Sequence, residues 1–410
     1  MTAALTARDR WSALLLWLVL VGLSTRLLVS AVQRHVLQTD ESPLLYHAAT
    51  LAFNYVDFGF VRRGLAGSFV HALGANWLRG TALFHVGAAA AVAAAACVLF
   101  ARLQRPLAER IAFALLLVAL MMRWAEDPGR TDIAVAVLLA LAAIASIAGR
   151  PLLAALAVAL GLFIHETAFV FGIPLLIGLW LDQGRWRALG RRDATGVATL
   201  LGAALLLYLA FDRLPHADAR TMVEVVRSHF PPHTYVDWAI YFAISGARGV
   251  RTSLCQNAND PTYWLHVGSG LLVIALFIGV LKRRRPGWPA LLVASVPPFL
   301  FLSVVANDIS RWAVLAAFNV WLLNAARPEA SPSGPGAAAW VRVALAALVV
   351  PLIHPKTWPI EDPIFAPTPV LERLARRLGG PPTPRFAQAL ERCDPGWRDV
   401  LDGAASRQAP

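Results

Sequence analysis

Long apolar runs, separated by clusters of arginine, constrain the fold of this chain more than any other feature of its sequence. Apolar side chains make up 58% of the 410 residues and charged ones only 15%, with a mean hydropathy of +0.58. This composition leaves too little polar surface for a soluble globule of this length. The sequence therefore predicts an all-α fold, a polytopic transmembrane helical bundle.

The apolar runs predict about 11 membrane spans, each close to the length that crosses a bilayer. Cytoplasmic loops are rich in arginine and lysine, so the basic clusters predict a cytoplasmic N-terminus and large outer loops at 33–80 and 212–262. The run at 151–181 is too long for one span and has basic residues at both ends, so we expect it to cross out and back. The spans are expected at residues 11–32, 81–100, 111–122, 133–147, 151–181 (a pair), 195–211, 263–281, 288–306, 312–325 and 340–353.

The chain divides into a transmembrane domain, residues 1–354, and a short extracytoplasmic tail of one or two helices, residues 355–410. The net charge of +12 does not indicate nucleic-acid binding, because the arginines fall between apolar segments. Lysine occurs only at Lys282 and Lys356, while alanine and arginine are abundant. We take this as the composition of a GC-rich bacterial genome and expect the bacterial inner (cytoplasmic) membrane as the location.

The stretch 39–74, in the first outer loop, concentrates charged side chains in a half-apolar context. A serine followed by Pro43 is typical of a helix start, so we expect an amphipathic helix along the membrane surface from there to about Tyr55. Asp57 and Gly59 are expected to break this helix. A second short helix is expected to begin near Arg62.

Two pairs of residues in this loop are candidates for chemistry. Asp40 and Glu41 precede the first helix, whose dipole favours ionised carboxylates, so they either complete the helix start or supply a catalytic base. Arg62 and Arg63 either anchor the loop to anionic lipid head groups or hold a phosphate.

Further carboxylates fall on the same outer side, and acids at a membrane boundary commonly mark a functional site. Each also has a structural interpretation: Asp132 begins a helix, while Asp308 and Arg311 form a local ion pair. His165 and Glu166 lack the further ligands of a zinc site and fit a hydrogen-bonded pair. The candidate substrate- or phosphate-binding residues are Arg62, Arg63, Asp57, Asp132, His165, Glu166, Asp308 and Arg311.

Two cysteines, Cys255 and Cys393, both fall on the predicted outer side, where disulfides persist. A bridge that joins the second outer loop to the tail and a pair of free thiols both stay open.

An acid in the first outer loop, directly after the first span, resembles the GT-C superfamily of integral membrane glycosyltransferases. The segments DFGFVRRG, GRTD and FIHETAF also resemble uncharacterised bacterial members. The resemblance covers roughly residues 1–212. It implies a hexosyl- or pentosyltransferase with a polyprenyl-phosphate sugar donor, a glycan or lipid acceptor, and Asp40 as base, with Glu41 second. The chain departs from the family in two ways: the first loop has no DXD motif, so a metal-dependent mechanism is not supported and no cofactor is expected, and no soluble catalytic domain follows the spans.

Two other classes of protein stay open. A Wzy/EpsG-like polysaccharide polymerase would depend on outer-loop arginines, above all Arg62, Arg63, Arg311 and Arg251. A lipid-linked sugar transporter or flippase would be expected to show an internal repeat and charges near the bilayer midplane. The sequence has no clear repeat, and its charges fall near the membrane boundary. In all three cases membrane lipids surround the chain.

Overall fold

The computed structural model describes residues 43–74, 76–102, 107–125, 130–182, 190–245, 247–259, 263–281, 287–306, 308–326 and 386–406. Within these ranges the regular structure is helical, and the β-type pairing is limited to one isolated bridge between Gly59 and His216. The predicted all-α fold is confirmed for this part of the chain. The spans expected at 11–32 and 340–353 lie outside the described residues.

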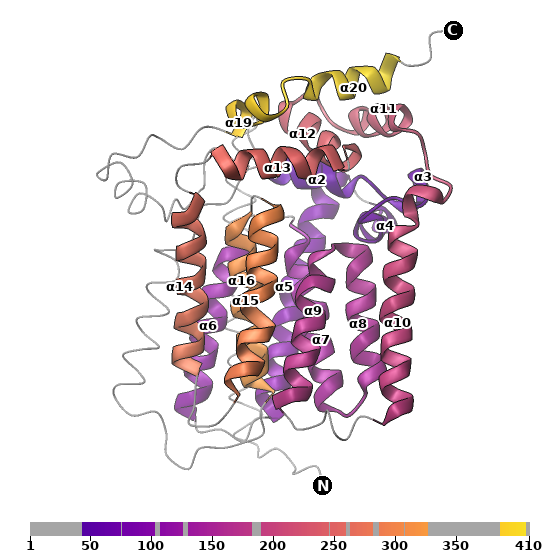
Figure 1. The fold of residues 1–410 in the computed structure, drawn as a ribbon. Coiled ribbons are helices and arrows are strands. Elements are labelled where there is room, and N and C mark those ends of the chain that lie inside the picture. The colour runs from indigo at the N-terminus through magenta and orange to yellow at the C-terminus, as the bar shows by residue number, and fades with distance from the viewer. Residues whose placement is uncertain are drawn as a thin grey trace, which may run out of the picture.

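Apolar helices run side by side and form the body of the molecule, here called the bundle (Figure 1). The run at 151–181 divides as predicted into an out-and-back pair. Pro151 opens the first helix, and His165, whose backbone is extended, separates it from the second. The bundle consists of α5 (Trp77–Arg102), α6 (Leu107–Ala125), α7 (Asp132–Ile147), α8 (Pro151–Ile164), α9 (Thr167–Asp182), α10 (Arg191–Leu209), α14 (Tyr263–Leu281), α15 (Trp288–Val305) and α16 (Ile309–Ala325).

Three of the described helices, α5, α10 and α15, are long and apolar enough to cross a membrane. A further helix, α13 (Ala247–Asn259), passes the same test with α14 only as a pair bent by 95°, and α7, α8 and α9 are apolar but shorter. Together with the composition, these helices mark a membrane protein. The expected number of about 11 spans is larger than length and composition support among the described residues, because several bundle helices are short for a bilayer.

A layer of shorter helices, here called the cap, lies across one end of the bundle (Figure 1). One hydrophobic cluster joins its parts, since buried Phe58 of the first loop shares it with Tyr241 of the second and Trp397 of the tail. The two loops and the described part of the tail therefore fold as one layer. The cap consists of α2 (Pro43–Leu51), α3 (Tyr55–Phe58), α4 (Gly64–Ala72), α11 (Ala219–His229), α12 (Thr234–Ile244), α13, α19 (Phe386–Cys393) and α20 (Trp397–Ser406).

The first cap helix, α2, differs from the surface helix that the sequence predicts. Leu45, Ala48 and Ala49 are buried in the hydrophobic cluster of the cap, and Leu51 packs in another cluster with Phe84 of α5. Because apolar side chains on several faces are covered by α12 and by the bundle, α2 lies in the interior. The prediction of a helix along the membrane surface was therefore wrong for α2.

The chain also turns earlier than predicted after α2. The side-chain oxygen of Asn54 accepts hydrogen bonds from the backbone N–H groups of Val56 and Asp57, both at 2.9 Å, and so begins α3. Asp57 thus lies inside a helix and does not break one. Gly59, with a φ of 72°, does end α3, and the backbone next to it is hydrogen-bonded to residues 215–217 of the second loop.

A buried asparagine compensates for a proline inside the bundle. Pro298 in α15 lacks the N–H that would bond the carbonyl of Ala294. Asn319 of α16 donates from Nδ2 to that carbonyl at 2.8 Å and to the carbonyl of Phe171 in α9 at 3.0 Å. Asn319 therefore holds α16 against two neighbouring helices at a point where the backbone of α15 is not hydrogen-bonded to itself.

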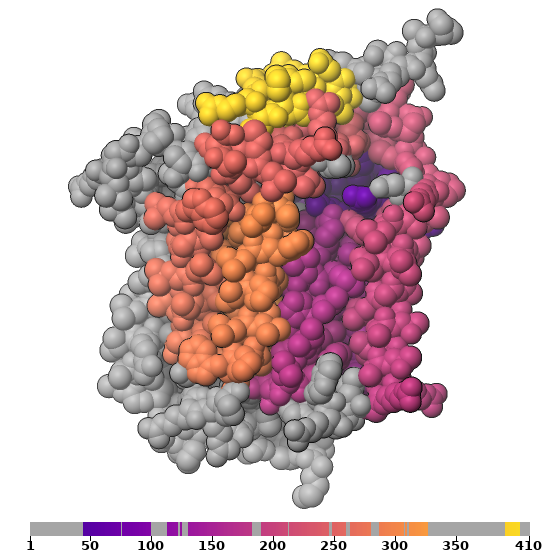
Figure 2. Space-filling model, viewed as in Figure 1, coloured from indigo at the N-terminus to yellow at the C-terminus, as the bar shows by residue number. Residues whose placement is uncertain are grey.

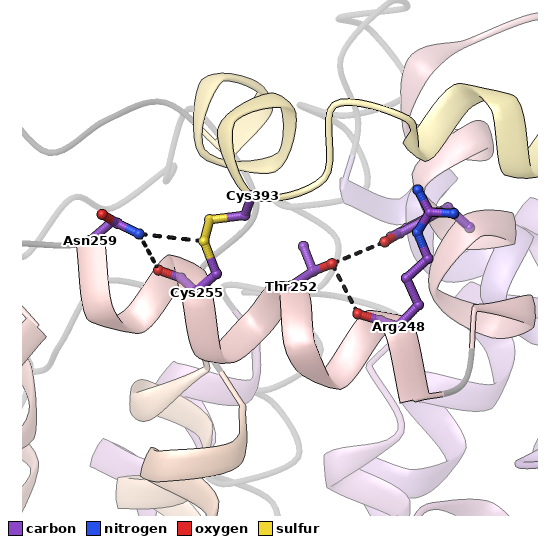
Figure 3. The surroundings of a disulfide bond; sticks show 6 residues. Arg248, Thr252, Cys255, Asn259 and Cys393 are labelled. Carbon is purple, nitrogen blue, oxygen red and sulfur yellow. Dashed lines mark hydrogen bonds between the residues drawn. A yellow bond between two sulfur atoms is a disulfide. The ribbon is translucent and has the colours of Figure 1, made fainter.

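The tail is joined to α13 at two points, of which Figure 3 shows the disulfide. Cys255 and Cys393 form a disulfide, with their Cα atoms 5.7 Å apart, so the bridge left open by the sequence is present. Asp394 accepts hydrogen bonds from the hydroxyl of Tyr241, at 2.5 Å, and from Nε of Arg248, at 2.6 Å. The start of α13 and its last turns are thus fastened to Asp394 and to Cys393, the last residue of α19.

Candidate functional site

Charged and tyrosine side chains from five separate segments meet where the cap covers the bundle. They come from the loop before α4, the start of α7, the break between α8 and α9, the end of α10 and the start of α16. In the space-filling view, the indigo atoms of the first loop lie recessed between the cap and the ends of the bundle helices (Figure 2). We call this set the charged cluster: Arg62, Arg63, Arg130, Asp132, His165, Glu166, Tyr208, Asp308 and Arg311.

Arg311 is the centre of the buried half of the charged cluster. Its Nε and Nη2 atoms donate to the two carboxylate oxygens of Asp132 at 2.5 and 2.7 Å, and its Nη1 donates to Asp308 at 2.7 Å. Nη2 also lies 3.2 Å from Nε2 of His165. The predicted local pair of Asp308 and Arg311 is therefore present, and Asp132 joins it from a helix far away in the sequence.

Arg63 is the centre of the more exposed half. Its Nε donates to Oε2 of Glu166 at 2.8 Å, and the hydroxyl of Tyr208 donates to Oε1 of the same carboxylate at 2.6 Å. The guanidinium of Arg62 lies over the ring of Tyr208, 5.8 Å from its centroid. These contacts connect the first outer loop to the ends of three bundle helices.

The backbone at Arg63 adopts a conformation that residues other than glycine rarely take. Its φ of 62° and ψ of 10° lie in the left-handed region, at a cost of roughly 1–3 kcal/mol. The helix that follows is held close to the chain before it, because a Cβ added at Gly67 would lie 2.1 Å from the carbonyl oxygen of Phe53. The tight packing of α4 sets this turn, and the turn presents Arg63 to Glu166.

Three members of this region were not predicted. Arg130 is buried, with Nη2 at 3.7 Å from Oδ1 of Asp308. Burial, with the charge of Asp308 next, raises the pKa of the Tyr46 hydroxyl in α2. Arg130 could have been predicted, because it lies two residues before the candidate Asp132. Tyr46 and Tyr208 could not, because tyrosines near helix ends commonly serve only as interfacial anchors.

Burial and neighbouring charges set the protonation of the two residues between α8 and α9. Burial, with the charge of Arg63 next, lowers the pKa of His165 to about 3, so this imidazole is neutral at physiological pH. Burial raises the pKa of the Glu166 carboxyl, but the Arg63 guanidinium outweighs that effect and holds the pKa well below its usual range. Glu166 is therefore ionised. Nδ1 of His165 lies 3.0 Å from the hydroxyl oxygen of Thr167 and 3.3 Å from its backbone nitrogen.

Two of the predicted residues are not seen in this cluster, and one lies apart from it. Asp40 and Glu41 fall outside the described residues. Asp57 accepts a hydrogen bond from Nδ2 of Asn54 at 2.7 Å and lies 3.7 Å from Nδ1 of His71. Its polar partners thus belong to the first loop itself, so the structure assigns Asp57 a local role and not a place with the other candidates.

The charged cluster is suited to an anionic ligand. Among its members, four arginines face three carboxylates and a neutral imidazole, which leaves one positive charge in excess. The side chain of Arg63 is 43% exposed, and within the described residues no hydrogen bond is made by its two terminal nitrogens. These nitrogens are free to bind a phosphate or carboxylate. Among the described residues, no group of three or more His, Cys, Asp or Glu side chains is placed to hold a metal ion.

Comparison of the chain with protein-family models, with curated proteins and with solved structures finds no match. The fold and the site thus define a helical membrane protein with a charged cluster between its bundle and its cap.

Proposed function

We propose that this chain is an integral membrane glycosyltransferase that moves a sugar from a polyprenyl-phosphate carrier to a glycan or lipid acceptor outside the cytoplasm. The observation that carries the proposal is the convergence of Arg62 and Arg63 with Glu166, Asp132 and Arg311. Five segments of an apolar chain place paired charges at one end of a helix bundle. Such charges are costly near a membrane and commonly serve a substrate.

The arginine pair supports a site for the phosphate of the donor. Arg63 is oriented by Glu166 through Nε, and within the described residues its two terminal nitrogens make no hydrogen bond. Arg62 precedes it and is exposed. Two adjacent guanidinium groups can hold a phosphate in the ground state and stabilise the charge that grows on it as the carrier departs.

The proposed base is Asp40, with Glu41 second. Asp132 and Glu166 have both carboxylate oxygens engaged by hydrogen bonds, which argues against either of them accepting a proton. Asp40 precedes α2 in the sequence, and α2 packs against α4, the helix that begins directly after Arg63. Asp40 would take the proton of the acceptor hydroxyl. The hydroxyl oxygen would attack the anomeric carbon, and the bond from that carbon to the phosphate oxygen would break with inversion.

Two features support an orientation with the cap outside the cytoplasm. The disulfide between Cys255 and Cys393 belongs to the cap, and disulfides persist in oxidising compartments. The turn between α7 and α8 and the start of α10, at the opposite end of the bundle, carry Arg150, Arg191 and Arg192, as the positive-inside rule expects of a cytoplasmic face. With the bacterial composition, this favours the inner membrane.

The test is sugar transfer from radiolabelled polyprenyl-phosphate sugars by purified protein in lipid nanodiscs. We expect Asp40→Asn and the double variant Arg62→Ala/Arg63→Ala each to lose transfer at least a hundred-fold, in the range known for groups that stabilise transition-state charge. A double variant of exposed cap arginines, Arg220→Ala/Arg227→Ala, removes the same charge and should keep full activity.

Full activity in Asp40→Asn would overturn the assignment of the base. Absence of turnover with every donor in the wild-type protein would overturn the transferase proposal and favour the polymerase or transporter.

A further inference from the structure

Tyr208, at the end of α10, is connected to both arginines of the proposed phosphate site. Its hydroxyl donates to Glu166, the carboxylate that orients Arg63, and its ring lies beneath the guanidinium of Arg62. The same side chain therefore contacts Arg62 directly and reaches Arg63 through Glu166. Glu166 is 33% exposed and Tyr208 is buried, so the tyrosine is the fixed partner of this group.

Aromatic packing fixes the ring of Tyr208. It lies 5.7 Å, centroid to centroid, from Phe211, and Phe211 contacts Phe60 of the first loop at 5.7 Å and Phe163 of α8 at 5.6 Å. Rings at such separations attract one another beyond the area that they bury. The same aromatic cluster thus connects the end of α10 to the loop that carries both arginines.

We propose that Tyr208 is a positioning residue that presets Arg62 and Arg63 for an anionic amphiphile. This inference rests on the proposed function and deepens it. The hydroxyl holds Glu166 at its second oxygen, so that the carboxylate cannot rotate away from Arg63. The ring supports Arg62 by a cation–π contact within the usual range of about 6 Å. Binding would otherwise have to order two flexible side chains, which costs affinity.

The two contacts are separable by substitution. Tyr208→Phe keeps the ring and the aromatic packing but removes the hydrogen bond to Glu166. Tyr208→Leu removes the support of Arg62 as well. The chain supplies a matched control, because the hydroxyl of Tyr241 also donates to a carboxylate, Asp394, that is paired with an arginine, and this group lies in the cap.

The experiment measures binding of farnesyl phosphate, with farnesol as the uncharged control, to full-length protein in phosphatidylcholine nanodiscs by titration calorimetry. We expect Tyr208→Phe to raise the Kd for farnesyl phosphate roughly ten-fold, the effect of one hydrogen bond to a charged group, and Tyr208→Leu to raise it further. Binding of farnesol should not change. Tyr241→Phe should bind both compounds as the wild type does.

The second measurement is a double-mutant cycle with Glu166→Gln. If Tyr208 acts through Glu166, Tyr208→Phe adds little in the Glu166→Gln background. A wild-type Kd for Tyr208→Phe, or an effect fully additive with Glu166→Gln, overturns the inference. If Arg62→Ala/Arg63→Ala leaves farnesyl phosphate binding unchanged, the proposed phosphate site itself is wrong. If that variant loses binding and Tyr208→Phe does not, only the role of Tyr208 is wrong.

Discussion

Removal of the Asp132 carboxylate is expected to destabilise the protein strongly, because the buried guanidinium of Arg311 then keeps only one of its two carboxylate partners, Asp308. Arg311 is 14% exposed and Asp132 2%, and two hydrogen bonds of 2.5 and 2.7 Å join them. At about 1.5–3 kcal/mol for each bond between charged groups, the pair accounts for roughly 3–6 kcal/mol. Breaking a buried ion pair by deleting one partner typically costs about 3–5 kcal/mol, so Asp132→Ala should lower the free energy of unfolding by about that amount.

The assay is unfolding in mixed micelles by titration with sodium dodecyl sulfate, followed by tryptophan fluorescence. Arg227→Ala is the control, since Arg227 pairs with Asp237 at 2.8 Å but the two are 40% and 33% exposed. Exposed pairs contribute at most about 1 kcal/mol. Replacement of both buried partners, Asp132→Leu with Arg311→Met, should restore much of the stability. A loss in Asp132→Ala no larger than in Arg227→Ala would refute this reasoning.

Three further predictions concern stability. Because the pKa of Glu166 is depressed, its contribution to the free energy of unfolding is complete above the ordinary value of 4.5 and declines as the pH falls below it. Glu166→Gln should therefore reduce the dependence of stability on pH between about pH 5 and 3, roughly the range in which a free carboxyl titrates. Equal acid sensitivity in both proteins would contradict this. Reduction of the Cys255–Cys393 bridge, or Cys255→Ser, should cost about 2–4 kcal/mol and make the tail sensitive to protease, whereas an unchanged digestion pattern would speak against it. Asn319→Leu should cost about 1–3 kcal/mol, because the carbonyl that Pro298 leaves free becomes unsatisfied, and thermal unfolding of Asn319→Leu against wild type measures it.

The sequence was informative about the ends of helices and uninformative about their partners. Basic residues on both sides of the run at 151–181 were enough to place His165 and Glu166 at the tip of a helix pair. The same rule placed Asp132 and Asp308 at that end of the bundle. These inferences depend on the apolar runs and on the basic residues at their ends, both of which can be read directly from the sequence.

Contacts between residues far apart in the sequence could not be predicted from local composition. The contact of Arg63 with Glu166 depends on the left-handed turn before α4, and that turn depends on the tight packing of α4 against residue 53. The burial of α2 was missed because its apolar residues also fit a helix on a membrane surface. The packing of α12 and α5 on it distinguishes the two, and neither contact can be read from the sequence of α2. Tyr208 was missed because its two roles arise from Glu166 and Arg62, which lie in two other segments.

The shared hydrophobic cluster of the cap has a consequence for biosynthesis. Ala48 and Phe58 of the first loop are covered in part by α12, and that layer is completed by Leu390 and Trp397 near the other end of the described chain. Insertion of the bundle can proceed helix by helix as the chain leaves the ribosome. The cap cannot close until the C-terminal segment has reached the same side of the membrane. A truncated or stalled chain would therefore hold an inserted bundle whose cap has its hydrophobic cluster partly uncovered, and quality-control proteases would meet the protein in that state.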